Sequence, residues 1–189
     1  MMSMTGGEKH QWKVLESKYL VKRKWLTARC DRVQLSNGVV NDEYYVLEYP
    51  EWVNTIAITR EGEFIVIRQY RHGIRETGYE ICAGICEEGE QPELAARREL
   101  LEETGYAGGE WSKLLEIAPN ASSMNNYTHC FLAVGVEKID DSHLDPTEEL
   151  DVFLLQKEEV FDLLQSGMIK QATMVAPLWK YFYEQSCGK

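Results

Sequence analysis

The chain has 189 residues, of which 44% are hydrophobic and 27% are charged, and its formal net charge is −11. A chain of this length can bury one full hydrophobic core and at most a small second unit. The acidic balance argues against nonspecific binding to nucleic acid or to an anionic membrane, because both need a basic surface.

The N-terminal sequence and the cysteines bear on the cellular compartment. The polar start, MMSMTGGEKHQWK, has no signal-peptide pattern, and no apolar run reaches transmembrane length. The five cysteines are odd in number and scattered, which is typical of reduced thiols. We therefore expect a cytoplasmic protein that binds neither a membrane nor nucleic acid.

Residues 1–49 are expected to form a β-rich region. Runs typical of β-strands predict strands over residues 11–17, 24–35 and 43–49, with a turn at Ser36-Asn37-Gly38. Three short strands cannot bury both faces of a sheet alone, and their edges can pair with another chain. The region therefore needs a second surface, either from its own chain or from a second copy.

After Pro50 the pattern becomes mixed, and residues 50–189 are expected to form the main domain. The sequence predicts two strands that pair across Glu61-Gly62, four later strands, and three helices. The strands are expected at residues 53–60, 63–71, 79–84, 111–119, 128–139 and 150–156, and the helices at residues 92–104, 157–165 and 169–184. This order predicts an α+β fold with a mixed sheet flanked by helices.

The segment GICEEGEQPELAARRELLEETGY, residues 84–106, carries the strongest functional pattern. Its spacing is G-x5-E-x7-R-E-U-x-E-E-x-G-U, where U is an apolar or aromatic residue. A chance match is on the order of one in 10^8 per starting position at ordinary residue frequencies. This pattern is the Nudix box, so the chain resembles the Nudix hydrolases.

The box can also be interpreted from its physical chemistry. Pro92 suits the first turn of a helix and Gly105 its end. At about 100° per residue, Leu94 and Leu101 share one stripe, which is expected to face a core. Three carboxylates lie together on another side, where their repulsion raises their pKa values. These are Glu99, Glu102 and Glu103. Oxygen ligands of this kind suit Mg²⁺ or Mn²⁺, whereas an isolated helix of this composition would more often present a solvated surface.

The resemblance implies an α/β/α sandwich and a role for each box residue. Glu99 and Glu103 would hold metal, with help from Glu102 and the carbonyl oxygen of Ala83. Glu90 and Arg98 would orient these carboxylates. The general base would come from a loop after the box, and Glu148 in the acidic stretch 140–149 is the preferred candidate. The alternative is that this stretch is only a solvated loop.

The sequences that flank the box resemble the ADP-ribose and ADP-sugar pyrophosphatase branch. They are RQYR at residues 68–71, the E-x-x-A-G that ends at Gly84, and PNASSMNN at residues 119–126. The branch implies hydrolysis of ADP-ribose to AMP and ribose 5-phosphate. Two departures are Cys82, where the branch usually has proline, and the sequence of the 119–126 loop. GDP-mannose or another nucleoside diphosphate derivative stays open as substrate, and so does a non-catalytic nucleotide-sensing module.

Four further residues are candidates for substrate binding: Trp52, Arg68, Arg71 and Glu80. Arg68 and Arg71 would point to opposite faces of a regular strand, so one of them could face solvent. Trp52 could stack on adenine or belong to the core or an interface, and Glu80 could anchor ribose or base. The branch also implies a homodimer with an exchanged N-terminal region.

Overall fold

A computed structural model describes residues 10–188, which divide into two compact units. The first contains the described residues up to Tyr49 together with residues 120–126, and the second contains residues 50–119 and those from Tyr127 onward. Residues 1–9, which hold most of the polar N-terminal stretch, and residue 189 lie outside the described part. Among the described residues, no helix is both long enough and apolar enough to cross a membrane.

The first unit is a three-stranded antiparallel sheet in the order β1-β2-β3. Its strands are β1 (Lys13–Arg23), β2 (Leu26–Gln34) and β3 (Val40–Glu48). Residues 120–126 pack on β3, where the Leu47 N–H donates to the Ser123 carbonyl at 2.7 Å. The predicted N-terminal antiparallel sheet is confirmed, although β1 is longer than predicted.

The second unit is built on a seven-stranded sheet with β10, β5, β4, β9 and β8 along its main path. The strands are β4 (Trp52–Thr59), β5 (Phe64–Arg71), β6 (Glu76–Glu80), β7 (Cys82–Ile85), β8 (Tyr106–Ile117), β9 (Thr128–Lys138) and β10 (Leu150–Leu155). Strands β4 and β9 run parallel, whereas the other pairs are antiparallel. The predicted mixed sheet is therefore confirmed.

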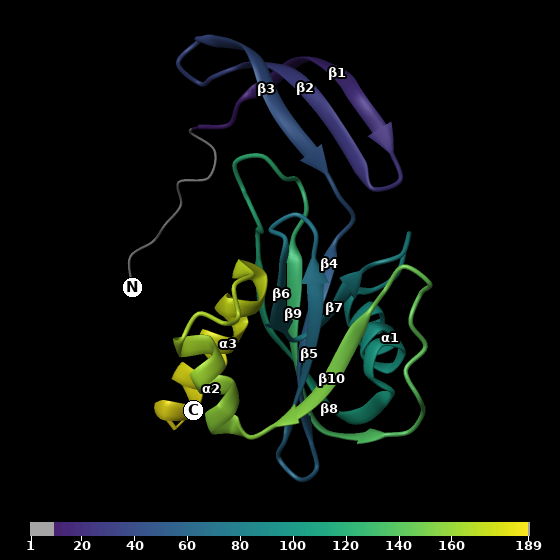
Figure 1. The fold of residues 1–189 in the computed structure, drawn as a ribbon. Coiled ribbons are helices and arrows are strands. Elements are labelled where there is room, and N and C mark those ends of the chain that lie inside the picture. Colours follow the sequence, from purple (N-terminus) through teal and green to yellow (C-terminus); the bar gives the residue numbers. More distant parts are fainter. Residues whose placement is uncertain (1–9, 189) are drawn as a thin grey trace. The chain divides into compact units, whose positions relative to one another are not determined.

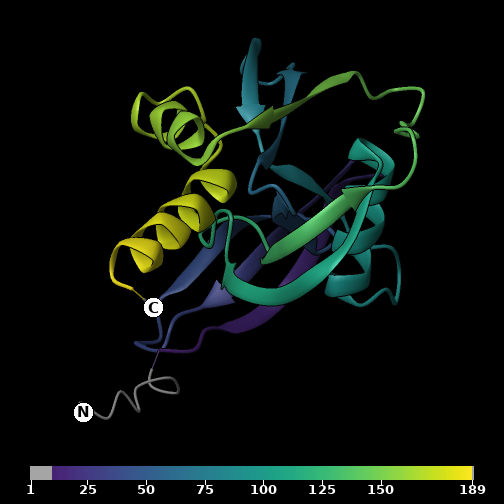
Figure 2. The ribbon, with the colours of Figure 1, turned by 90° about the horizontal axis from the view of Figure 1, so that it is seen from below.

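Helices cover both faces of this sheet (Figures 1 and 2). Helix α1 (Pro92–Thr104) packs on one face, and helices α2 (Lys157–Gln165) and α3 (Ala172–Ser186) pack on the other. The core beneath α2 and α3 includes Phe64, Val160 and Leu178. On the α1 side, Leu100 packs against residues of β4, β5, β7 and β9.

Two predicted boundaries differ from the structure. The single strand predicted over residues 79–84 is two strands, because β6 pairs with β5 and β7 pairs with β4. Ile81 lies between them and is buried in the core under α2 and α3. Helix α3 starts at Ala172 instead of residue 169, since Ile169 is buried and its N–H donates to the Leu163 carbonyl.

Helix α1 begins and ends as the sequence predicts. Pro92 occupies its first turn, and Gly105 ends it in the left-handed region with φ 74° and an N–H that donates to the Leu101 carbonyl. The predicted core stripe was wrong for Leu94, whose side chain is exposed. The buried face instead carries Ala95, Ala96, Leu100, Glu103 and Thr104. At about 100° per residue, Leu94 lies about 120° around the helix from Leu100 and so points away from this face.

Candidate active site

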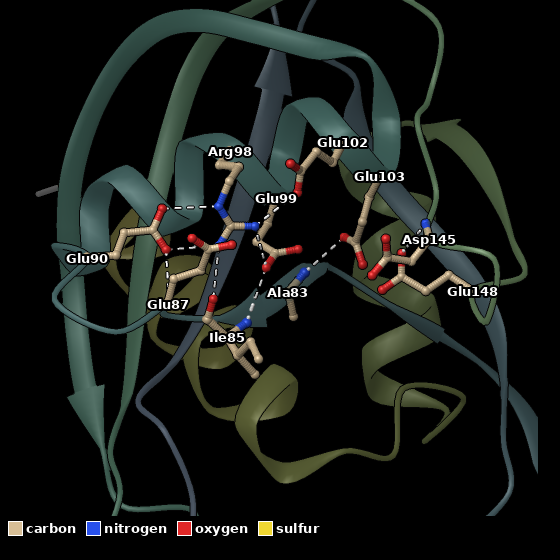
Figure 3. A network of polar contacts seen from close by, with 10 residues as sticks. All are labelled: Ala83, Ile85, Glu87, Glu90, Arg98, Glu99, Glu102, Glu103, Asp145 and Glu148. Carbon is tan, nitrogen blue, oxygen red and sulfur yellow. Dashed lines mark hydrogen bonds and ion pairs between the residues drawn. The ribbon is translucent and has the colours of Figure 1, made fainter. Parts of the chain in front are cut away.

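The catalytic candidates lie where strand β7 faces helix α1 (Figure 3). Glu99 accepts a hydrogen bond from the Ile85 N–H at 3.3 Å, and its carboxylate lies directly against Gly84. A Cβ atom at residue 84 would collide with that carboxylate. The first glycine of the box is therefore needed for the close approach of Glu99 to the strand.

Arg98 links the carboxylates of the box. Its guanidinium makes two hydrogen bonds to Glu90, at 3.0 and 2.9 Å, and one each to Glu99 and Glu102, both at 2.9 Å. The remaining N–H donates to the Ile85 carbonyl at 3.0 Å. All five donors of the guanidinium are used, so its position is strongly constrained. The hydrogen bonds that Arg98 donates to Glu90 raise the pKa of Arg98 and lower the pKa of Glu90.

Glu103 is the most buried carboxylate of helix α1, with 5% of the residue exposed. It accepts a hydrogen bond from the Ala83 N–H at 3.1 Å. Burial raises the pKa of Glu103 to about 8, and the charges of Glu99 and Glu148 add to this effect. Burial also raises the pKa of Glu99.

These residues fit a divalent cation by their chemistry. Glu99, Glu102 and Glu103 offer carboxylate oxygens, which Mg²⁺ and Mn²⁺ prefer. Glu103 is buried, and the charges of Glu99 and Glu148 also disfavour its ionised form, so a cation would stabilise that form. Within residues 10–188, no three acidic, histidine or cysteine side chains already form a compact cation cluster. Arg98 instead bridges Glu99 and Glu102, as Figure 3 shows.

The loop after β9 returns to the end of α1. The Gly105 carbonyl accepts hydrogen bonds from the N–H groups of Ile139 and Asp140, and the Glu102 carbonyl accepts one from His143 at 2.7 Å. Further along, the Glu148 carboxylate accepts a hydrogen bond from the Asp145 N–H at 3.1 Å. Figure 3 shows Glu148 beside Glu103, with the two carboxylates directed toward each other.

Arg71 lies on the same side of the sheet. It makes two hydrogen bonds to the buried Glu80, at 2.8 and 2.7 Å. The hydrogen bonds to Glu80 raise the pKa of Arg71, and the charges of Glu103 and Glu148 contribute to the same shift. Arg71 is thus a fixed positive charge that faces the carboxylates, whereas Glu80 serves as its partner.

Arg68 and Trp52 lie elsewhere. The Arg68 guanidinium is 5.9 Å from the centre of the Tyr79 ring, and Tyr79 packs on the core under α2 and α3. Arg68 is therefore on the sheet face opposite to Arg71. Trp52 is half-buried at the start of β4, between Ile85 on β7 and Thr128 on β9.

Two contributions to the site were not predicted from the sequence. They are the N–H and C=O groups of Ile85, and the Asp145 N–H that holds Glu148. Backbone groups carry no residue signature, so neither contribution has a signal in the sequence.

The close approach of Gly84 and Glu99 leads to a first prediction. Gly84→Ala should leave the protein folded, because the colliding atoms belong to the flexible end of the Glu99 side chain. The displaced carboxylate should lower kcat roughly 10- to 100-fold, as misplaced catalytic groups do. Gly73→Ala is the matched control, since a Cβ there would meet nothing within 4 Å. Equal kcat values for the two variants at saturating Mg²⁺ would refute the role of Gly84.

Comparison with known protein families gives two matches. Residues 12–47 match the nucleoside diphosphate sugar hydrolase N-terminal domain, and residues 49–177 match the NUDIX domain. The second match covers more than half of the chain and includes every box residue described above.

Individual relatives agree with these matches. An ADP-ribose pyrophosphatase of Bacillus subtilis (strain 168) is 30% identical over 85% of this chain and 89% of its own length. A methanol dehydrogenase activator of Bacillus methanolicus is 28% identical, over 89% of this chain and 91% of its own. A GDP-mannose pyrophosphatase of Enterobacter sp. (strain 638) is 25% identical, over 84% of this chain and 85% of its own length. A crystal structure of an ADP compounds hydrolase has the same fold, with a TM-score of 0.81 at 22% identity, covering 94% of this chain and 96% of that one.

Proposed function

The chain belongs to the Nudix hydrolases, with the N-terminal domain of nucleoside diphosphate-sugar hydrolases, and on that premise we propose that it hydrolyses ADP-ribose to AMP and ribose 5-phosphate. The observation that carries the proposal is the grouping of Glu99, Glu103 and Glu148, on the side of the sheet where Glu80 holds Arg71. Hydrolysis of a diphosphate needs negative ligands that hold a cation, and it also needs a positive side chain of the protein beside the phosphates.

Each residue has a specific task in the proposed reaction. Glu99, Glu102 and Glu103 would hold Mg²⁺ or Mn²⁺, which would neutralise charge on the diphosphate. Arg98 and Glu90 keep the carboxylates in place, and the five hydrogen bonds of Arg98 support this task. Arg71, held by Glu80, would contact a phosphate.

Glu148 is proposed as the general base that takes the proton of the attacking water. Its side chain is exposed and lies beside Glu103, so a water molecule between substrate and loop could reach it. The hydrogen bonds that tie the loop to the end of α1 support this position. A base must lie within hydrogen-bond reach of the proton that it removes.

The choice of ADP-ribose rests on the flanking sequences and on two relatives at 30% and 28% identity that are ADP-ribose pyrophosphatases. GDP-mannose is the alternative, because several relatives at 25% to 29% identity are GDP-mannose pyrophosphatases. The box acts on the diphosphate, which both substrates share. Stacking of the base on Trp52 is part of the proposal, with Trp52 supplied by a second copy of the chain in the dimer proposed below.

The experiment is a substrate panel with purified protein and Mg²⁺. Release of AMP or another nucleoside monophosphate is measured for ADP-ribose, ADP-glucose, GDP-mannose, NADH, diadenosine polyphosphates and 8-oxo-dGTP, with EDTA as control. We expect ADP-ribose to have the highest kcat/KM and EDTA to abolish release. A higher kcat/KM for GDP-mannose would replace the proposed substrate, and no hydrolysis of any compound would favour a nucleotide-sensing module.

We also propose a homodimer with exchanged N-terminal regions. Many large apolar side chains of the first unit are exposed, which is common at interfaces and rare on monomers. They are Trp12, Val14, Leu15, Tyr19, Leu20, Val21, Trp25, Leu26, Val39, Val40 and Tyr45. A second copy of the chain would cover them in an isologous arrangement.

Light scattering should therefore report a mass near twice 21.8 kDa. The interface is expected to exceed about 2,000 Å², as in obligate dimers. Trp25→Lys, at a side chain in the first unit that is 70% exposed, should shift the mass toward the monomer. Ile139→Lys changes an exposed apolar side chain of the second unit and should not. A monomer at micromolar concentration with full activity on ADP-ribose would contradict the dimer.

A further inference from the structure

The chain enters the second unit at two places, and the side chain of Glu51 joins them. The unit begins at Pro50 and resumes at Tyr127. The Glu51 carboxylate accepts a hydrogen bond from the Tyr127 N–H at 3.1 Å. The Tyr127 carbonyl in turn accepts a hydrogen bond from the Trp52 N–H at 2.9 Å. Two consecutive residues, Glu51 and Trp52, therefore hold the backbone of Tyr127.

His129 holds the Glu51 carboxylate. Its Nε2 atom lies 3.0 Å from the same Glu51 oxygen that accepts the hydrogen bond from Tyr127. Its Nδ1 atom lies 3.1 Å from a carboxylate oxygen of Glu116. The side chain of His129 is only 13% exposed, whereas that of Glu51 is 41% exposed. An imidazole with a carboxylate oxygen at each ring nitrogen is fixed in orientation from both sides, so the His129 ring can fix a carboxylate that also reaches solvent.

The contacts of Glu51 surround the backbone of Trp52. Besides its side-chain contacts, Glu51 accepts a hydrogen bond from the Cys86 N–H at its main-chain oxygen, at 2.8 Å. Trp52 itself lies in β4 between Ile85 of β7 and Thr128 of β9. These contacts restrict the backbone at Trp52, and hence the direction in which its indole ring leaves the strand. The side chains of Glu51 and His129 have no other task in the reaction proposed above.

We propose that Glu51 and His129 are positioning residues that hold Trp52 for stacking on the nucleobase. The proposal rests on the proposed function, in which Trp52 binds the base. Stacking on an aromatic side chain contributes to binding of the substrate, whereas the diphosphate reacts at the carboxylates of α1. Loss of the pair should therefore raise KM and leave kcat nearly unchanged.

The test uses two pairs of variants in the full-length protein. Glu51→Gln keeps an oxygen that can accept from both Tyr127 and His129, whereas Glu51→Ala removes it. His129→Phe keeps a ring of similar size but loses both ring nitrogens. His72→Phe is its matched control, because His72 is exposed and its ring contact with Tyr70 can also be made by phenylalanine.

Three measurements separate a local effect from a general loss of structure. Amide hydrogen exchange, followed by NMR without substrate, reports on Trp52 and Tyr127, with Ala133 in the middle of β9 as the reference. Titration calorimetry gives the Kd for AMP, which requires no hydrolysis. The values of kcat and KM are measured with the best substrate of the panel, and circular dichroism reports whether each variant folds.

We expect the amide of Tyr127 to exchange at least about 10-fold faster in Glu51→Ala and in His129→Phe, with Ala133 unchanged. In both variants the Kd for AMP and the KM should rise about 5- to 10-fold, while kcat stays within about 2-fold of the wild type. Glu51→Gln and His72→Phe should match the wild type in all of these quantities.

Wild-type exchange at Tyr127 in folded Glu51→Ala and His129→Phe would overturn the proposal. Faster exchange with an unchanged Kd for AMP would also overturn it, and so would equal effects of Glu51→Gln and Glu51→Ala. If His129→Phe does not fold, the two Glu51 variants decide. A wild-type protein that hydrolyses nothing would defeat the proposed function, whereas the exchange rates and the Kd for AMP would still decide the role of the pair.

Discussion

Glu103→Gln is expected to leave the protein folded and to lower kcat by at least about 100-fold, which corresponds to about 2.7 kcal/mol of barrier. Glu103 lies at the centre of the candidate site, where it accepts a hydrogen bond from the Ala83 N–H. Glutamine has nearly the same shape and keeps an acceptor oxygen, so the packing of α1 is preserved. It lacks the negative charge that a divalent cation requires.

The control for this change is Glu93→Gln. Glu93 lies in the first turn of the same helix and forms an exposed ion pair with Arg97 at 2.8 Å. Exposed pairs of this kind contribute only about 0–1 kcal/mol to stability, so the control should keep nearly full activity. Near-normal kcat of Glu103→Gln at saturating Mg²⁺ would remove Glu103 from the proposed metal site.

The raised pKa of Glu103 should make the stability of the folded protein depend on pH. Burial raises this pKa from 4.5 to about 8 in the folded protein. Between these values the folded state binds a proton that the unfolded state has lost. In metal-free buffer, stability should therefore fall as the pH rises from 4.5 toward 8, by at most about 1.4 kcal/mol per pH unit from this residue. Urea unfolding of the wild type and of Glu103→Gln measures the difference, which should grow with pH over this interval.

Glu148→Gln is expected to lower kcat about 100-fold while KM for ADP-ribose and metal affinity change little, as for loss of a general base. Glutamine can still accept the hydrogen bond from the Asp145 N–H, so the loop should keep its position. The variant then isolates the loss of the proton acceptor from any change in the loop.

Glu149→Gln is the matched control, because the neighbouring residue is exposed and has the same chemistry. A larger loss of kcat in Glu149→Gln would transfer the role of base to Glu149. Full activity in both variants would make Glu102 the leading candidate for the general base, since 46% of its side chain is exposed.

The local sequence pattern was sufficient to predict helix α1 and the grouping of its glutamates. Pro92 and Gly105 mark its ends because both act through the backbone of a few neighbouring residues. Glu99, Glu102 and Glu103 share one side because helical periodicity depends only on spacing along the chain. For the same reason the box was recognisable without the structure. The exposure of Leu94 could not be obtained in this way, because it depends on which face of α1 packs on the sheet.

The remaining features of the site were decided by contacts between residues that are distant in sequence. The pairing of β5 with β6 places Arg71 on Glu80 and leaves Arg68 on the opposite face. The raised pKa of Glu103 comes from burial between α1 and β7, and a glutamate in the sequence does not reveal burial. Glu148 lies 45 positions after Glu103 in the numbering, and the return of its loop to the end of α1 brings the two together. The spacing of residues along a helix determines which side chains share a face, whereas only tertiary packing determines which faces meet and which carboxylates lose their water.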